Sequence, residues 1–186
     1  MTALPCPKCE GSKLKEPSSG TQVLRCYECG GMWLAADEAK ALALDGTIVD
    51  PASMLPTKSG ASDARTGFCP KGHGLLIRAR VEIEEDPFYL EQCPHCVGIW
   101  FDHGEWHRLA SSRLLEHLSD FWNPAWQRRR RAELSEARHK RKLAEGLGED
   151  LVDSLDAIAK RIMGHPLRNE VLAYLSGKSE GRPKTR

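Results

Sequence analysis

The most regular alternation of apolar and polar residues in this 186-residue chain lies between residues 75 and 84. Charged or polar neighbours separate the apolar side chains over much of this run, which is typical of a half-buried strand; the apolar positions are Leu75, Ile77, Ala79, Val81 and Ile83. Residues 85–87 (Glu-Asp-Pro) indicate a turn, and residues 88–90 (Phe-Tyr-Leu) lead back. The pattern therefore predicts a β-hairpin. A shorter hairpin is expected earlier, with its tip at residues 17–20 and a returning strand at residues 21–25.

Helical spacing of apolar residues begins shortly after each of two tryptophans, Trp33 and Trp100. The first helix is expected at residues 37–44, which are rich in Ala and Leu. For the second, Asp102 is the predicted N-cap, and one apolar face carries Trp106, Leu109, Leu114, Leu118 and Phe121.

The last third of the chain has an entirely helical pattern. Asn123 and Pro124 form a suitable N-cap and first position for a helix that runs to about Glu145. Gly146 and Gly148 interrupt it, and a second, amphipathic helix follows; its apolar face holds Leu151, Val152, Leu155, Ile158, Ala159 and Ile162. Residues 164–166 (Gly-His-Pro) break the pattern again before a final helix at about residues 167–175.

All seven cysteines and one histidine fall into the spacing of zinc ligands. Two Cys-x2-Cys pairs lie sixteen residues apart, and a Cys-x3-His pair precedes a third Cys-x2-Cys pair by nineteen residues. Two such short pairs can close around one tetrahedral Zn²⁺. The sequence therefore predicts two structural zinc sites, the first formed by Cys6, Cys9, Cys26 and Cys29 and the second by Cys69, His73, Cys93 and Cys96.

Disulfides are the alternative use of these cysteines. The odd count, the ligand spacing and an N-terminus without the features of a secretory leader favour zinc in a reducing compartment, and we expect a cytoplasmic protein. No run of residues approaches the roughly 20 apolar residues of a membrane span.

The chain repeats itself without a gap. Residues 26–42 and 93–109 both fit the pattern C-x2-C-x-G-x-W-[LF]-x3-E-x3-L. We therefore expect a small, metal-stabilised α+β protein of two tandem zinc ribbons, each a zinc-clamped hairpin with a helix, followed by a helical region. The expected boundaries are 1–45 for the first ribbon, 46–67 for a flexible linker, 68–122 for the second ribbon, 123–176 for the helical region and 177–186 for a disordered tail.

Charge separates the two ends of the chain. Residues 1–105 carry 10 Lys/Arg against 15 Asp/Glu, whereas residues 106–186 carry 17 against 11. Within residues 124–145 there are 8 basic residues against 3 acidic ones: Arg128, Arg129, Arg130, Arg131, Arg138, Lys140, Arg141 and Lys142. Such a helix can follow phosphates or rest on an acidic surface, and it can also simply be a solvated charged helix.

The repeated motifs resemble the transcription factor IIB-type zinc ribbon of small bacterial proteins. The resemblance covers about residues 5–44 and 68–110, where residues 26–34 and 96–105 carry the C-G-G-x-W-[LF] and W-[LF]-D-x-G-E features. It implies zinc held by the paired knuckles. His73 departs from the usual cysteine, and Ala35 and Asp37 depart from the usual Asp and Gly.

Three functions remain open at this point. The first is a non-enzymatic protein that attaches to nucleic acid or its machinery through the basic helix. The second is a protein–protein adaptor that binds no nucleic acid. The third is a metal-dependent enzyme using Asp102, His103, Glu105 and His107, although a capped helix start with solvated histidines explains these four residues more simply. Trp33 and Trp100 suit a role in covering the zinc knuckles, with stacking on a base as the alternative.

Overall fold

The computed structural model describes residues 4–16, 23–45, 65–83 and 86–179. The expected linker lies mostly outside the described residues, as do the tip of the first hairpin and most of the tail. The described chain forms two compact units, residues 1–134 and residues 135–186. In chain order the elements are β1 (Leu24–Arg25), β2 (Met32–Leu34), α1 (Ala36–Asp45), β3 (Ile77–Val81), β4 (Phe88–Gln92), β5 (Ile99–Phe101), α2 (Glu105–Ser111), the 3₁₀ helix η1 (Leu115–His117), α3 (Pro124–Leu147), α4 (Glu149–Met163) and α5 (Arg168–Ser179).

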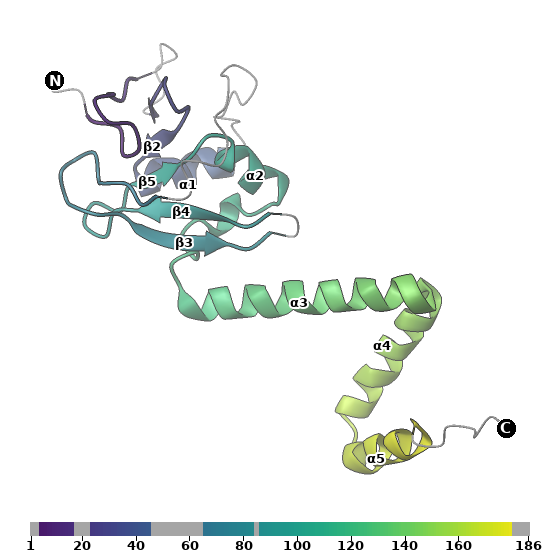
Figure 1. Cartoon of the computed structure of the whole chain (residues 1–186). Coiled ribbons are helices and arrows are strands. Elements are labelled where there is room, and N and C mark those ends of the chain that lie inside the picture. The colour runs from purple at the N-terminus through teal and green to yellow at the C-terminus, as the bar shows by residue number, and fades with distance from the viewer. Residues whose placement is uncertain (1–3, 17–22, 46–64, 84–85, 180–186) are drawn as a thin grey trace. The chain divides into compact units, whose positions relative to one another are not determined.

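Both repeats contribute to one five-stranded antiparallel sheet in the order β1-β2-β5-β4-β3 (Figure 1). The central pairing joins the last strand of one ribbon to the last strand of the other, with Trp33 opposite Trp100. Met32 pairs with Phe101 and Leu34 with Ile99, so equivalent positions of the two repeats exchange places across the pairing. The mixed α+β class with a helical C-terminal region is confirmed, and the two ribbons are halves of one sheet.

Alternation along the central strands divides the apolar residues between two cores. Met32 and Leu34 of β2 and Ile99 and Phe101 of β5 enter the larger core. Residues of α1, of α2, of the turn before α3 and of the start of α3 also enter it, including Ala39, Trp106, Leu109, Phe121 and Trp126. The intervening tryptophans point to the other face and pack in a second core with zinc-ligand cysteines. This division follows from the two-residue period of a strand.

The five apolar residues predicted on the second helix are all buried in the larger core, but they do not share one helix. Helix α2 ends at Ser111, and Arg113 adopts a left-handed conformation with φ of 55° that turns the chain before η1. Only a few per cent of non-glycine residues adopt this conformation, and it stops helical propagation. Residues of α2, residues on either side of η1 and the turn before α3 therefore fill the core that one continuous helix was predicted to fill.

The predicted N-cap at Asp102 is wrong. The N-cap of α2 is Gly104, which makes no side-chain cap bond. The carboxylate of Asp102 instead accepts a hydrogen bond of 2.7 Å from Nε1 of Trp100. A side-chain hydrogen bond at the start of α2 comes from Glu105, whose Oε2 accepts from the backbone N–H of Asp102 at 2.7 Å.

The hairpin of the second repeat is shorter than its alternating pattern. Ala79 and Val81 are buried as expected, whereas Leu75 and Ile77 are exposed and Leu76 is buried. The reason is local pairing: the backbone N–H of Leu76 donates to the carbonyl of Gly67, which directs Leu76 toward the zinc-side core.

The helices of the last third follow their predicted pattern, except that Gly146, which was expected to interrupt the first of them, lies inside α3. Oδ1 of Asn123 accepts from the N–H groups of Ala125 and Trp126 at 2.9 and 3.4 Å, so it caps α3 as predicted. Gly148, with φ of 85°, separates α3 from α4. No helix among the described residues combines the length and the apolar composition that a membrane span requires.

Candidate metal centres and the contact between the repeats

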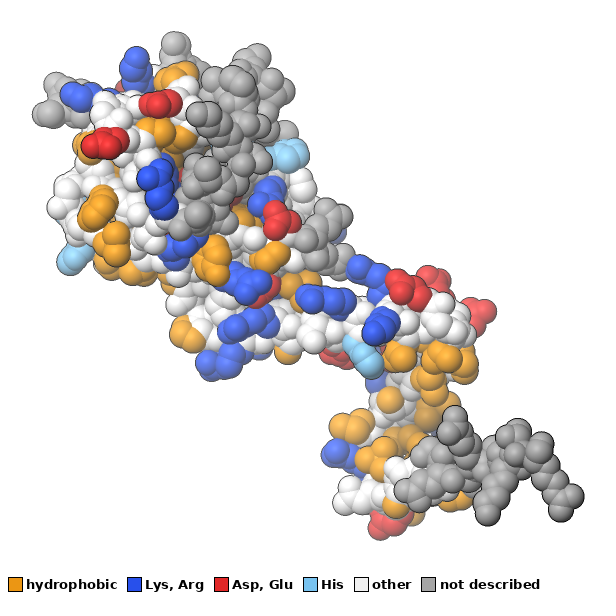
Figure 2. Space-filling view, viewed as in Figure 1, with side chains coloured by type: hydrophobic (Ala, Val, Ile, Leu, Met, Phe, Trp, Pro, Cys, Tyr) orange, Lys and Arg blue, Asp and Glu red, His pale blue; other side chains and the backbone are white. Residues whose placement is uncertain are grey.

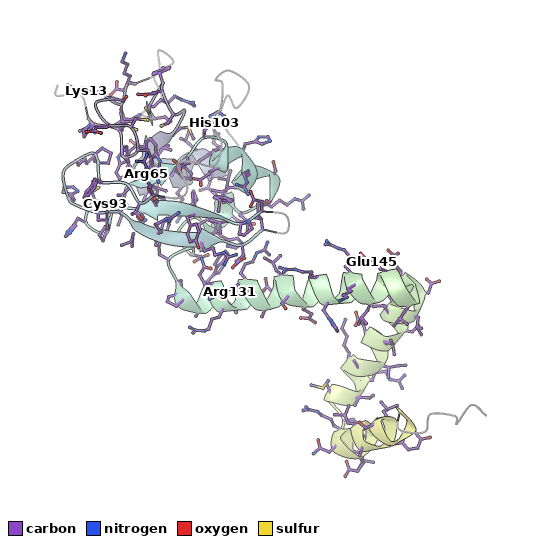
Figure 3. All side chains as sticks on the ribbon, viewed as in Figure 1. Lys13, Arg65, Cys93, His103, Arg131 and Glu145 are labelled. Carbon is purple, nitrogen blue, oxygen red and sulfur yellow. The ribbon has the colours of Figure 1, made fainter. Side chains whose placement is uncertain are left out.

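Two groups of side chains among the described residues bring their ligand atoms within 4.8 Å of one another. The first contains Cys6, Cys9, Cys26 and Cys29, and the second contains Cys69, His73, Cys93 and Cys96. Each group unites the two ends of a hairpin, because Cys93 directly follows β4 and Cys26 directly follows β1. Figure 3 shows Cys93 at the end of the sheet away from the β3–β4 connection. All seven cysteines are free thiols.

The distances within each group fit tetrahedral zinc. Zn–S bonds of about 2.3 Å and Zn–N bonds of about 2.0–2.1 Å separate two sulfur ligands by roughly 3.8 Å and a sulfur from a nitrogen by roughly 3.5 Å. The sulfur atoms of Cys6 and Cys29 lie 3.8 Å apart, and those of Cys69 and Cys96 lie 3.7 Å apart. Nδ1 of His73 lies 3.5 Å from the sulfur of Cys69 and 3.6 Å from that of Cys93. Two zinc ions therefore suit these groups, and Nδ1 is the histidine atom placed for ligation.

One thiol of each group has a lowered pKa, and for Cys6 the neighbouring Cys29 side chain is the largest cause, followed by backbone N–H groups. The N–H groups of Lys8 and Cys9 donate to the sulfur of Cys6 at 3.4 and 3.3 Å. Together with a stronger contribution from Cys29, they lower the pKa of Cys6 to about 6 against the opposing effect of burial. Burial also raises the pKa of Cys93, but donation from Cys96 and His95 outweighs it and lowers this pKa to about 6. A thiolate is the form that binds zinc.

The two groups differ in exposure. His73 is exposed, whereas every ligand candidate of the first group is buried or half-buried. His95 lies with its ring centroid 6.0 Å from that of His73, and no described metal-ligand group includes it. The second group is therefore accessible to solvent at His73.

Trp33 and Trp100 lie between the two metal groups, each against a glycine of the opposite repeat. A Cβ atom added to Gly31 would lie 2.0 Å from Cζ2 of Trp100, and one added to Gly98 would lie 2.2 Å from Cζ2 of Trp33. The two indoles are 2% and 1% exposed, so they are not available to stack on a base. The Gly-x-Trp element of the repeated motif is thus a reciprocal contact between the repeats, which periodicity within either repeat does not reveal.

A buried ion pair adds a second contact between the repeats. Lys8, between the first two cysteines, places its Nζ 2.9 Å from Oε1 of Glu91 and 3.7 Å from Oδ2 of Asp102. The side chains of Lys8 and Glu91 are 3% and 1% exposed. Burial raises the pKa of Glu91, and the ammonium of Lys8 acts against this shift. No sequence signal pairs these residues, because 83 positions separate Lys8 from Glu91.

Three of the four residues considered for catalysis make structural contacts. Asp102 binds the indole of Trp100, and Glu105 binds the backbone of Asp102. The ring of His103 packs against Gly30 of the first repeat. A Cβ atom added to Gly30 would lie 2.5 Å from Nδ1 of His103. His107 is exposed, and neither metal-ligand group among the described residues contains any of the four. In the first repeat, Glu38 acts as Glu105 does, accepting from the N–H of Ala35 at 3.1 Å.

Residues 5–44 and residues 69–112 each match the family model described as transcription factor zinc-finger. Both repeats are therefore similar to the zinc ribbons of this family. The two matched segments coincide with the repeats that the sheet unites, and α3, α4 and α5 lie outside them. No curated protein and no solved structure shows a significant match to the chain.

The residues predicted to bind nucleic acid or a partner all lie on α3. Arg128, Arg129 and Arg131 are exposed, whereas Arg130 is half-buried with its Nη1 3.8 Å from Oε2 of Glu133. In the second cluster the residues from Arg138 to Lys142 are exposed. Within this cluster, Nζ of Lys140 lies 3.0 Å from Asp153 and 2.6 Å from Asp156 of α4. Its charge is therefore engaged within the chain.

Proposed function

We propose that this chain is a non-enzymatic zinc-ribbon protein that attaches to nucleic acid, or to the machinery that handles nucleic acid, through α3. In this proposal the eight predicted ligands hold two zinc ions. The ions stabilise the ribbons and take no part in a reaction, because four protein ligands leave no open position for a substrate. A reducing compartment such as the cytoplasm suits seven free thiols that serve as zinc ligands.

The exposed arginine cluster of α3 carries this proposal. Arg128, Arg129 and Arg131 present three guanidinium groups within little more than one helical turn. Figure 2 shows Lys and Arg side chains spaced along this part of the surface, and Figure 3 marks Arg131 and Glu145 on α3. Arg binds phosphate oxygens in a planar, bidentate manner. The transcription factor description of the family agrees with a nucleic-acid partner.

The mode of binding follows from what the surface offers. The tryptophans of both ribbons are buried, which leaves charge as the main source of affinity. Three phosphate contacts on duplex DNA give a slope of log K against log salt of about −2.7, so affinity falls roughly fortyfold between 50 and 200 mM salt. We expect little dependence on base sequence, because phosphate contacts carry no sequence information.

Fluorescence anisotropy of labelled random-sequence DNA and RNA tests the proposal. The informative variant changes Arg128, Arg129 and Arg131 to Gln and leaves the half-buried Arg130 unchanged. Its matched control changes three exposed lysines of the ribbons to Gln, namely Lys13, Lys15 and Lys71. We expect the arginine variant to lose most of the binding and the control to retain it.

Two results would reject attachment through α3. Equal losses in the arginine variant and the lysine control would show that overall charge decides binding. Absence of binding at low salt would leave the alternative function, a protein–protein adaptor with structural zinc.

A further inference from the structure

Helix α4 carries an apolar stripe with the spacing of a coiled-coil seam. Leu151, Leu155, Ile158 and Ile162 follow one another at intervals of four, three and four residues. This is the a/d spacing with which one helix packs along another. Leu151, Leu155 and Ile158 are 49%, 45% and 48% exposed within the structure. Figure 2 shows hydrophobic side chains gathered on the surface of α4 and α5.

The contacts of α4 within its own chain use a different side of the helix. Asp153 and Asp156 bind Lys140 of α3, and Val152 is buried at 2% exposure. At 3.6 residues per turn, Asp153 lies opposite the stripe and Asp156 lies well away from it. The end of α3 therefore occupies one side of α4 and leaves the stripe uncovered.

Helix α5 covers the stripe incompletely. A cavity of about 270 Å³ remains between the two helices and is lined by Ile158, Arg161, Ile162, His165 and Val171. Leu172 and Leu175 of α5 are themselves exposed. Exposed apolar surface that continues over two helices is typical of an interaction site.

Charge along α4 indicates the partner. Glu149 and Asp150 stand in its first turn and Lys160 and Arg161 in its last. Asp150 and Arg161 are eleven residues apart, about three turns, so they flank the stripe on the same side. An antiparallel second copy of α4 places Leu151 opposite Ile162 and Leu155 opposite Ile158. It also brings each Asp150 beside the other Arg161, whereas a parallel copy places the two acidic first turns at one level and the two basic last turns at another.

We propose that the chain forms a homodimer in which the α4 stripe of one copy packs antiparallel against the α4 stripe of a second copy. In the antiparallel orientation, the acidic first turn of one α4 lies beside the basic last turn of the other, which a parallel orientation does not allow. The proposal is independent of nucleic-acid binding, since α3 contributes none of the stripe.

Sedimentation equilibrium of the full-length, zinc-loaded chain tests the dimer. We expect the Leu155→Ser/Ile158→Ser variant to raise the dimer dissociation constant at least about tenfold. Leu44→Ser, at an exposed leucine of α1, is the matched control and leaves it unchanged. Leu155, Ile158 and Leu44 are all exposed, so far-UV circular dichroism of the variants should match that of the original chain.

Charge reversal tests the orientation. Asp150→Arg and Arg161→Asp each weaken an antiparallel dimer, and the variant with both changes restores it. A chain that stays monomeric at every concentration overturns the proposal. So does a dimer that the α4 substitutions leave intact, or one that the double reversal fails to restore.

Discussion

Lys8 and Lys71 occupy the same place in the two Cys-Pro-Lys motifs but have opposite environments. Lys8 is buried against Glu91 and near Asp102, both from the second ribbon, whereas Lys71 is exposed. The repeat alignment explains the difference. The positions equivalent to Glu91 and Asp102 in the first ribbon are Leu24 and Ala35, which offer no carboxylate to Lys71.

Replacing Lys8 by Met should destabilise the first unit by about 3–5 kcal/mol, because Glu91 then remains buried without its strongest partner. Lys71→Met, the same change at the exposed lysine, should alter stability by less than about 0.5 kcal/mol. Urea unfolding of the zinc-loaded chain, followed by tryptophan fluorescence, measures both. Adding Glu91→Gln to Lys8→Met should recover part of the loss. Equal effects of the two lysine changes would contradict the ion pair's role.

At the scale of elements, the antiparallel pairing of β2 with β5 fixes the relation between the ribbons. Each strand carries a tryptophan that covers a glycine of the other repeat. Glycine is required there because a methyl group would overlap the indole ring. The pairing and these contacts make the zinc-side core continuous from one metal group to the other.

Gly31→Ala should destabilise the chain by about 1–3 kcal/mol, since the new methyl group overpacks against Trp100. Gly146→Ala is the matched control, because this helical glycine has open space around its Cβ position. It should be neutral or stabilising by up to about 1 kcal/mol. Trp100→Phe removes the part of the indole that clashes, so the Gly31→Ala/Trp100→Phe pair should be less destabilised than the two single changes added together. Simple additivity in denaturant unfolding would disprove the contact.

Local patterns predicted the elements better than they predicted the contacts between them. Asn123 and Pro124 determine the start of α3 through neighbouring backbone groups, so the sequence alone locates it. Ligand spacing likewise grouped the cysteines, because both ends of a hairpin are close in the chain. The joint sheet could not be predicted in this way, since its central pairing joins strands about 67 residues apart, where loop closure gives no local signal. The turn at Arg113 was not predicted, because an arginine does not by itself favour the left-handed conformation. The packing of the surrounding apolar residues imposes this conformation.

At the scale of the whole molecule, both metal groups stabilise the same sheet. Cys26 and Cys93 each follow a strand of this sheet, and Trp33 and Trp100 pack between the groups. Metal binding to small ribbons contributes directly to folding. Loss of one ion should therefore weaken retention of the other, which independent ribbons on a flexible linker would not show.

The variant Cys93→Ser/Cys96→Ser tests this coupling. We expect purified protein to retain markedly less than one zinc per chain, measured by native mass spectrometry, whereas the unaltered chain retains two. The far-UV signal of the unit at residues 135–186 should persist, because both metal-ligand groups found among the described residues lie in the other unit. Full retention of one zinc at the first site, with the affinity of the unaltered chain, would show that the ribbons fold separately.

The exchange of equivalent residues across β2 and β5 describes a local twofold axis at Trp33 and Trp100. Two identical chains with a single ribbon each could form the same contact, but their assembly would depend on concentration. Joining both ribbons in one polypeptide makes this step intramolecular. In one polypeptide the two ribbons can also differ in sequence. Lys8 could then acquire a buried carboxylate partner while Lys71 stayed in solvent, an arrangement that a strictly symmetric pair cannot contain.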